Sequence, residues 1–329
     1  MIYIVTLPNG YFGSAGASWK TLSPEKISKD LISKGYDIKY TSIENIISFD
    51  LKSDDIVVYT SSDDESIRAY VKDIIYLISK QCTVIPSLDA LMAHENKGFQ
   101  QIFREKNGFG DLKGSYFFHL DDAPEAFPFV YKTAMGAGSS GVELIEEKRD
   151  IKKIKGMFRT PLKRAIIMLA RALKLNPEEF NRYKYRYKKK RLSVSQQYLP
   201  GLVGDYKILI FGKKIFILER KVSKGTFKAS GSGLFSFPSK KDISKDLLNY
   251  AKSIHEKLDV PYSSLDIAKS DAGFHLIEYQ ATNFGPYTLV ESPGHFIFEN
   301  DEWVYISGSS DLEDCFSEAI LEYIERVHA

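Results

Sequence analysis

The first 90 residues alternate short apolar runs with longer amphipathic stretches. Apolar and β-branched runs predict short strands at residues 2–6, 37–42, 55–59 and 83–85. Residues 65–80 carry apolar side chains at positions 67, 71, 74, 75 and 78, which is the spacing of one helix face. Ser23 followed by Pro24 marks another helix start, and Gly35 lies where that helix should end. Strands that alternate with helices predict a small parallel α/β lobe of about 90 residues.

Later in the chain the pattern changes to longer strands and hairpins. Strands are predicted at residues 129–133, 193–199, 206–211, 215–220, 264–268 and 274–279. Glycine-containing turns separate the last four of these runs into two hairpins. Residues 243–258 and 311–327 have helical spacing. The predicted fold class is therefore α/β (α+β), divided into residues 1–90, 91–195 and 196–329.

Composition excludes a disordered or fibrous protein, because 43% of the 329 residues are hydrophobic and 27% are charged. The formal net charge of +2 is small, yet it hides one strongly basic segment. Residues 151–191 contain 15 Lys and Arg against 2 Glu, a local charge of +13. The rest of the chain is therefore acidic.

The two cysteines, Cys82 and Cys315, form neither a disulfide framework nor a metal-ligand spacing. The N-terminus lacks the pattern of a signal peptide, and no run of 18 apolar residues follows it. We therefore expect a cytoplasmic protein.

A lysine at a strand end precedes a Gly/Ser loop. Lys132 is followed by residues 136–141, which include Gly138, Ser139 and Ser140. Backbone N–H groups in such a loop can approach phosphate oxygens where no Cβ intrudes, and the lysine adds charge. The loop is not a Walker A motif, because the lysine comes before the glycines.

A second segment suits an adenine base. An amide pair and an apolar pair stand next to each other in Gln196, Gln197, Tyr198 and Leu199. Backbone groups there can bond the edge of the base while the apolar pair packs on it. Asp205 follows and can accept hydrogen bonds from ribose hydroxyls.

Basic and acidic residues stand on the later strands. Arg220 precedes a basic, glycine-rich stretch that contains Lys228 and could close over phosphates. Asp266 and Glu278 lie in two strands with apolar neighbours, and Gln280 follows closely. Buried acids need partners, and hard oxygen donors suit Mg²⁺.

In this order, these elements resemble the ATP-grasp superfamily, and most closely its RimK-like and D-alanine–D-alanine-ligase-like carboxylate–amine ligases. The resemblance covers roughly residues 90–295, after a family-type pre-ATP-grasp α/β lobe. It implies that Lys97 and Lys132 contact ATP phosphates, that residues 196–199 form the adenine hinge, and that Arg220 faces the γ-phosphate. It also implies that Asp205 is the acidic residue that contacts the ribose or stands at the hinge.

The same resemblance implies a metal set of Asp266, Glu278 and Gln280. Gln280 departs from the family, which has Asn there, so Asn283 is an alternative third ligand. The implied cofactors are ATP and Mg²⁺, with two ions.

The implied reaction is amide formation between a small-molecule carboxylate and an amine through an acylphosphate, with Arg220 and Lys132 as catalytic residues. The segment 278–286 is similar to the corresponding segment of family members that are associated with bacterial surface-polysaccharide synthesis. A homodimer is compatible with the sequence.

The basic insert, residues 151–191, leaves several interpretations open. Residues 159–175 predict a basic amphipathic helix that suits an anionic membrane surface or a partner groove. Residues 182–191 alternate tyrosines with cations, which suits either an exposed strand with an aromatic face or base stacking. The candidate partners are an anionic glycan carrier, the inner membrane face and, last, nucleic acid.

Two other functional classes remain at this stage. One is a nucleic-acid- or polyanion-binding module on a degenerate ATP-grasp fold, which steep salt dependence of binding would reveal. The other is a phosphotransferase that stops at phosphoryl transfer and releases ADP without forming an amide.

Overall fold

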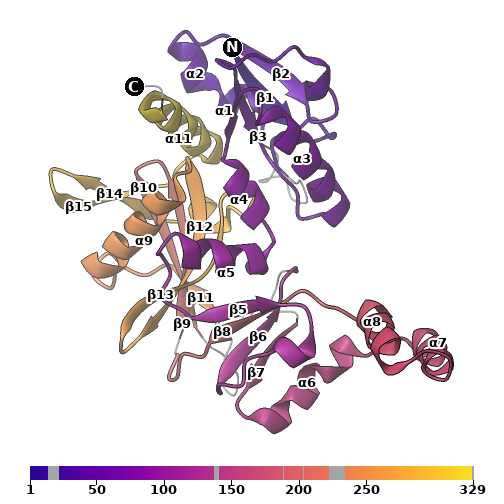
Figure 1. Cartoon of the computed structure of the whole chain (residues 1–329). Coiled ribbons are helices and arrows are strands. Elements are labelled where there is room, and N and C mark those ends of the chain that lie inside the picture. Colours follow the sequence, from indigo (N-terminus) through magenta and orange to yellow (C-terminus); the bar gives the residue numbers. More distant parts are fainter. Residues whose placement is uncertain (14–21, 137–140, 188, 203, 222–233, 328–329) are drawn as a thin grey trace. The chain divides into compact units, whose positions relative to one another are not determined.

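The computed structural model describes the chain apart from residues 14–21, 137–140, 188, 203, 222–233 and 328–329. The described chain forms two compact units (Figure 1). Unit 1 comprises residues 1–95, 108–111 and 200–329, and unit 2 comprises residues 96–107 and 112–199. The division of the chain at residues 90 and 195 stays a prediction.

The start of unit 1 is a four-stranded parallel sheet in the order β2-β1-β3-β4. Its elements are β1 (Ile2–Thr6), α1 (Pro24–Ile27), α2 (Lys29–Ser33), β2 (Ile38–Ser42), the 3₁₀ turn η2 (Ile46–Ser48), β3 (Ile56–Tyr59), α3 (Glu65–Ile78), β4 (Thr83–Ile85) and α4 (Leu88–Ala93). Every residue of β1 and β3 is buried, as expected for parallel strands that are covered on both faces. The predicted parallel α/β lobe is confirmed.

The rest of unit 1 is built on a mainly antiparallel sheet in the order β13-β12-β9-β10-β14-β15, with β11 paired to β10. Its elements are β9 (Gly204–Phe211), β10 (Lys214–Lys221), β11 (Phe235–Ser236), α9 (Lys245–Leu258), β12 (Tyr262–Ser270), β13 (Gly273–Gln280), α10 (Tyr287–Val290), β14 (Gly294–Glu299), β15 (Glu302–Ser307) and α11 (Leu312–Val327). Both predicted hairpins are present, as β9–β10 and β12–β13.

One hydrophobic core joins the two sheets of unit 1. Ile4 and Val58 of the parallel sheet pack in the same cluster as Phe211 of β9 and Ile320 of α11. Phe211 and Tyr262 place their ring centroids 4.9 and 4.7 Å from that of Phe316. The other face of the parallel sheet packs against α3 in a second cluster. Unit 1 is therefore one cooperative body, although its two sheets lie far apart in the sequence.

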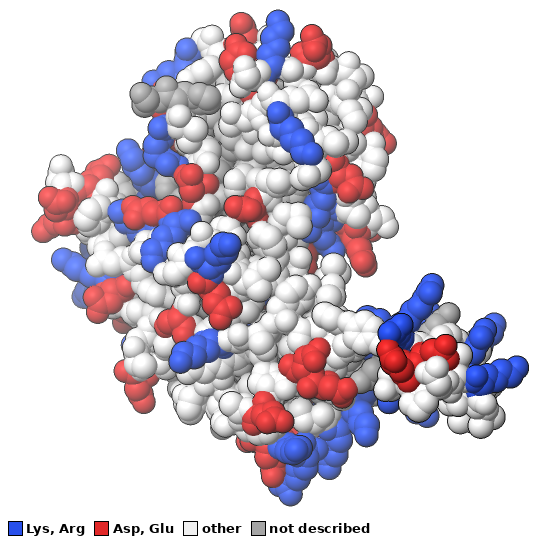
Figure 2. Space-filling view, in the orientation of Figure 1, with Lys and Arg blue, Asp and Glu red and all other residues white. Residues whose placement is uncertain are grey.

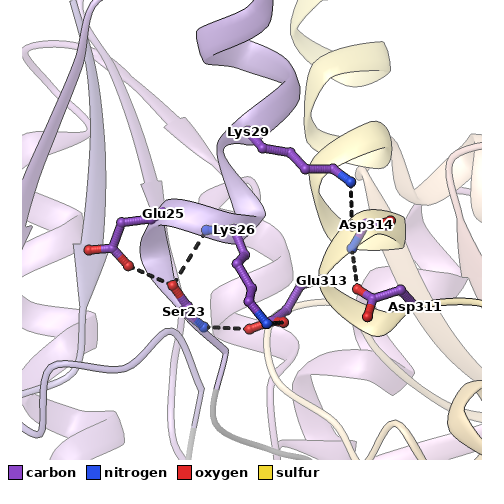
Figure 3. A network of polar contacts seen from close by, with 7 residues as sticks. All are labelled: Ser23, Glu25, Lys26, Lys29, Asp311, Glu313 and Asp314. Carbon is purple, nitrogen blue, oxygen red and sulfur yellow. Dashed lines mark hydrogen bonds and ion pairs between the residues drawn. The ribbon is translucent and has the colours of Figure 1, made fainter.

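Polar contacts reinforce this core where α1 and α2 meet α11 (Figure 3). Glu313 accepts from the backbone N–H of Ser23 at 2.8 Å and pairs with Lys26 at 2.9 Å, and Lys29 pairs with Asp314. Ion pairs exposed to water contribute little stability. These contacts join α1 and α2 to α11, whereas the apolar cluster beneath supplies the stabilisation.

Unit 2 is an antiparallel sheet in the order β5-β8-β6-β7, with helices inserted between β7 and β8. Its elements are α5 (Lys97–Lys106), β5 (Gly114–Phe117), η3 (Leu120–Asp122), β6 (Phe129–Thr133), β7 (Val142–Ile145), η4 (Lys148–Asp150), α6 (Ile151–Lys155), η5 (Gly156–Phe158), α7 (Leu162–Ala172), α8 (Pro177–Tyr187) and β8 (Ser193–Gln197). A Cβ at position 98 would lie 2.3 Å from the Tyr116 ring, so glycine there lets α5 approach β5.

The basic insert contains helices where one interpretation expected an exposed strand. The strand expected within residues 182–191 is wrong, because α8 continues to Tyr187. Asn176 and Glu179 cap its start reciprocally, with side-chain-to-backbone hydrogen bonds of 2.9 and 3.2 Å. Glu178 pairs with Arg182 one turn later. The capping hydrogen bonds and this ion pair stabilise the helix, and they outweigh the preference for a strand that the alternation of tyrosines and cations suggested. Within the described ranges, no helix combines the length and apolarity that a bilayer crossing needs.

We predict that Phe211→Ala lowers the free energy of unfolding by about 3–5 kcal/mol, because the ring lies at the centre of the shared core. Urea unfolding should show one transition for both sheets of unit 1. Tyr70→Ala is the control, since that ring is 43% exposed, and it should change stability by less than about 0.5 kcal/mol. Separate transitions for the two sheets would contradict a shared core.

Candidate functional site

A row of charged side chains crosses the antiparallel sheet of unit 1. Asp266 on β12 lies opposite Glu278 on β13 and opposite Lys207 on β9. Two positions before Lys207, Asp205 lies opposite Arg220 on β10. Partners across a ladder share one face, as do alternate residues of a strand. All five side chains therefore start from the same face of the sheet.

Four of these side chains form a buried ion-pair network. Asp266 pairs through one carboxylate oxygen with Lys207 Nζ at 3.0 Å and through the other with an Arg220 terminal nitrogen at 3.0 Å. Arg220 Nε donates to Asp205 at 2.6 Å. The side chain of Arg220 is 15% exposed and that of Asp205 is 4% exposed. Two cations thus match two carboxylates, as buried charges require.

The network separates the acidities of its two carboxyl groups. Burial opposes ionisation of Asp266, but Lys207 and Arg220 outweigh it and lower its pKa to about 2. Burial raises the pKa of Asp205 to about 6, with the nearby Asp266 charge adding to the effect and Arg220 opposing it. Burial favours loss of the Arg220 proton, yet the two carboxylates raise the pKa of its guanidinium further. Arg220 is therefore held in place as a permanent cation.

Gln280, at the end of β13, connects this row to residues 94 and 95. Its amide nitrogen donates to Glu278 at 3.4 Å and to Glu95 at 3.3 Å. Its amide oxygen accepts from the Glu95 backbone N–H at 3.2 Å and lies 3.0 Å from His94 Nδ1. In this orientation the amide nitrogen, not the oxygen, faces the carboxylates.

His94 gives this amide a second possible orientation. Burial lowers the pKa of His94 to about 4, so its imidazole is neutral near pH 7. A neutral imidazole has one N–H, yet its two nitrogens face two oxygens, of Gln280 and of Ser62 at 3.2 Å. Reversing the amide would let Gln280 donate to His94 and would place an oxygen beside Glu278. The hydrogen bond from the Glu95 backbone would be lost.

The donor set fits Mg²⁺. Asp266 and Glu278 are carboxylates directly opposite each other on neighbouring strands, and Lys207 and Arg220 already pair with the two oxygens of Asp266. A metal ion at this pair would therefore share Asp266 with these two cations. Mg²⁺ takes one or two carboxylates and keeps several waters, so this pair suffices. Within the described ranges, no three His, Cys, Asp or Glu side chains group to hold a metal. The third ligand, Gln280 or Asn283, stays a prediction.

In unit 2, two lysines lie at the end of β6, where the Gly/Ser loop begins. Lys132, which is 8% exposed, donates to the Gln196 side chain on β8 at 2.6 Å. Lys97 opens α5 after its cap Asn96, and its Nζ donates to the Gly136 carbonyl at 2.6 Å. The backbone N–H of Lys97 also donates to the carbonyl of Ala134 at 2.8 Å. Both lysines thus lie next to the start of the Gly/Ser loop, and their role as phosphate contacts stays a prediction.

The structure describes the remaining predicted adenine contacts but not the predicted residues of the phosphate loops. Gln197 is exposed, and Tyr198 and Leu199 are half-buried directly after β8. The loop residues and the lysine of the glycine-rich stretch lie outside the described residues: Gly138, Ser139, Ser140 and Lys228.

Sequence reasoning missed Lys207, His94 and Glu95 as members of the site. Lys207 could have been found, because it shares a strand face with Asp205. His94 and Glu95 reach Gln280 from a segment 185 residues earlier, and no local pattern announces that contact.

No family model and no curated protein sequence matches the chain. Solved structures share its fold. D-cycloserine synthetase DcsG gives a TM-score of 0.53 at 12% identity, over 98% of this chain and 99% of that one. ATP-grasp ligase PsnB with a minimal precursor gives 0.53 at 11%, over 98% of each chain. D-alanine–D-alanine ligase from Bacillus anthracis complexed with ATP gives 0.51 at 12%, over 99% and 98%. The ATP-grasp fold expected from the sequence is confirmed.

We predict that Arg220→Met lowers the free energy of unfolding by about 3–5 kcal/mol, because it leaves two buried carboxylates without their shared cation. Adding Asp205→Asn should restore part of that loss. The matched control is Arg326→Met, which removes an exposed pair with Asp259 and should cost less than about 1 kcal/mol. Equal losses in chemical denaturation for the two arginine variants would refute the network.

We also predict acid sensitivity from His94. Its pKa is about 4 in the folded protein and 6.5 without burial, so between these values only the unfolded chain takes up the proton. The free energy of unfolding should fall on the order of 3 kcal/mol as the pH drops from 6.5 to 4. The measurement is the difference between wild type and His94→Gln, in which other buried histidines cancel. A pH-independent difference would contradict the prediction.

Proposed function

We propose that this chain, which has the ATP-grasp fold, is an ATP- and Mg²⁺-dependent ligase that joins a small-molecule carboxylate to an amine through an acylphosphate. The observation that carries the proposal is the buried network in which Asp205 and Asp266 hold Arg220 beside the Asp266–Glu278 pair. Structures with the same fold are described as ligases, and one of them is complexed with ATP. That description supports the reaction class proposed for this chain.

The proposal gives each residue a role. Lys97 and Lys132 bind the phosphates, together with the loop residues Gly138, Ser139 and Ser140 and with Lys228. The adenine contacts are Gln196, Gln197, Tyr198 and Leu199. The metal ligands are Asp266 and Glu278, with Gln280 or Asn283 as the third. Mg²⁺, when bound, neutralises charge on the phosphate oxygens.

Arg220 and Lys132 stabilise the transferring phosphoryl group, which carries dispersed negative charge. Both cations are already held by neighbouring side chains, Arg220 by two carboxylates and Lys132 by Gln196. Groups fixed in advance need little reorganisation when the charge develops. Asp205 was expected at the ribose. We propose that it also positions Arg220, because its carboxylate accepts from Arg220 Nε.

The chemistry follows from leaving groups. The substrate carboxylate oxygen attacks the γ-phosphorus, and the bond to ADP breaks. The amine then attacks the acyl carbon, the C–N bond forms, the bond to the phosphate oxygen breaks, and the amine loses a proton. A free carboxylate would have to expel oxide, whereas the acylphosphate expels phosphate. Water must be kept out until the amine has reacted.

The finer assignment concerns the substrate. The segment 278–286 resembles the corresponding segment of proteins that are associated with bacterial surface-polysaccharide synthesis. We therefore propose a sugar carboxylate and an amino-acid amine as substrates to test first, in a cytoplasmic reaction.

We predict ATP-dependent amide formation in a matrix of carboxylates and amines, with product detection by mass. Asp266→Asn combined with Glu278→Gln should lower turnover at least about 100-fold, since it removes both carboxylates of the metal site. The matched control is Glu299→Gln with Glu302→Gln, an exposed pair that is also directly opposite in the same sheet. It should leave turnover unchanged.

Three outcomes would overturn the proposal. Full turnover by the Asp266/Glu278 variant would remove the site assignment. Release of ADP without amide, with every amine tried, would indicate a phosphotransferase. Absence of ATP binding together with salt-sensitive polyanion binding would indicate a binding module.

A further inference from the structure

Helix α7 carries an apolar stripe that no described residue covers. Its members are Leu162, Ile166 and Leu169 of the helix and its C-cap Leu173, with residue exposures of 76, 59, 68 and 84%. They recur at intervals of four, three and four positions, so they lie on one face of the helix. Side chains this apolar and this exposed, grouped on one helix, indicate a surface that meets another apolar phase.

Within the arm formed by α7 and α8 (residues 162–187), α7 contacts α8 through a face other than the stripe. The Arg171 guanidinium lies over the Tyr183 ring of α8 at 5.6 Å, and Arg171 is about half a helical turn from the stripe. The arm is attached at its base, where Lys189 N–H donates to Thr160 Oγ1 at 3.3 Å and Arg191 N–H donates to the Phe118 carbonyl at 3.0 Å. Figure 1 shows α7 and α8 to one side of the sheet of unit 2. The stripe is thus presented outward.

Cations flank the stripe. Lys163 lies along one side of it, Arg164 and Arg171 lie behind, and Lys174 follows the C-terminal end of the helix. Helix α7 contains no acidic residue. Residues 159–191 hold 12 Lys and Arg against 2 Glu, and one of these two, Glu178, pairs with Arg182 at 2.5 Å. In Figure 2 the visible face of the arm is mostly blue and white, with red in one area.

This combination favours an anionic bilayer over other partners. A basic amphipathic helix lies in the membrane interface with its apolar face among the acyl chains and its cations at the headgroups. A second copy would bring α7 cations next to α7 cations, with no acid on the helix to offset them. For base stacking by nucleic acid, two tyrosine rings of the arm are already engaged: Arg171 lies over Tyr183, and Tyr185, although 56% exposed, packs on His119 at 5.1 Å and under Lys190 at 4.8 Å.

We propose that the α7–α8 arm binds the surface of bilayers that contain anionic phospholipid, with the apolar stripe of α7 inserted at the level of the headgroups. This inference concerns binding alone and does not depend on the catalytic proposal, because it is tested without nucleotide or substrate.

The test is co-sedimentation of the full chain with vesicles of phosphatidylcholine, with or without phosphatidylglycerol. Wild type should bind the anionic vesicles only, and added salt should weaken binding. Changing the four stripe residues to Ser should weaken binding at least about tenfold, as should Lys163→Glu with Lys174→Glu. The matched controls are Ile32→Ser with Ile47→Ser, and Lys240→Glu with Lys241→Glu, which alter exposed residues of unit 1 and should bind as wild type does.

A second measurement guards against a folding defect in the stripe variant. Leu169→Trp should shift its fluorescence to shorter wavelength on anionic vesicles and stay unchanged on phosphatidylcholine. The proposal is overturned if wild type ignores anionic vesicles at low salt, or if the folded stripe variant binds them equally. It is also overturned if wild type, without binding vesicles, forms dimers that the stripe variant abolishes, or binds an oligonucleotide.

Discussion

The site depends on the sharing of Arg220 by two carboxylates on a sheet face that water scarcely reaches. Neither Asp205 nor Asp266 could remain charged there alone, since an unpaired buried carboxylate gains a proton instead. The guanidinium suits this double role, because its fixed donors reach Asp205 through Nε and Asp266 through a terminal nitrogen. A lysine would offer one point charge in place of that fork. Side-chain ion pairs therefore connect β9, β10 and β12 in addition to their backbone hydrogen bonds.

Local patterns sufficed to predict much of the fold. β1, β4 and β6 begin and end as their apolar runs predict, and both hairpins follow from their turns. The hairpin of β14 and β15 was not predicted, although Asn300 and Asp301, both at positive φ, form a turn favourable to it. In the site, residue type and order suggested Lys132, Arg220 and Asp266. Which cation meets which carboxylate depends on strand register and long-range contacts, which one sequence does not reveal.

Gln280 shows how one extra methylene changes a site. Its longer side chain brings the amide within reach of His94, whose own surroundings keep it neutral. In the observed orientation the amide oxygen faces His94 and the amide nitrogen faces Glu278. In the reversed orientation the amide would donate to His94, and its oxygen would be available to a metal ion beside Glu278. A shorter Asn at this position would lack that choice.

The shared core of unit 1 has a consequence for synthesis of the protein. Ile4 and Val58 leave the ribosome early, whereas their partners Phe316 and Ile320 come near the end of the chain. At ordinary translation rates the delay is on the order of tens of seconds. One side of the first sheet stays uncovered during that time, while the segments of unit 2 are made within the interval. Nascent chains therefore need protection at the beginning of the sequence rather than at its end.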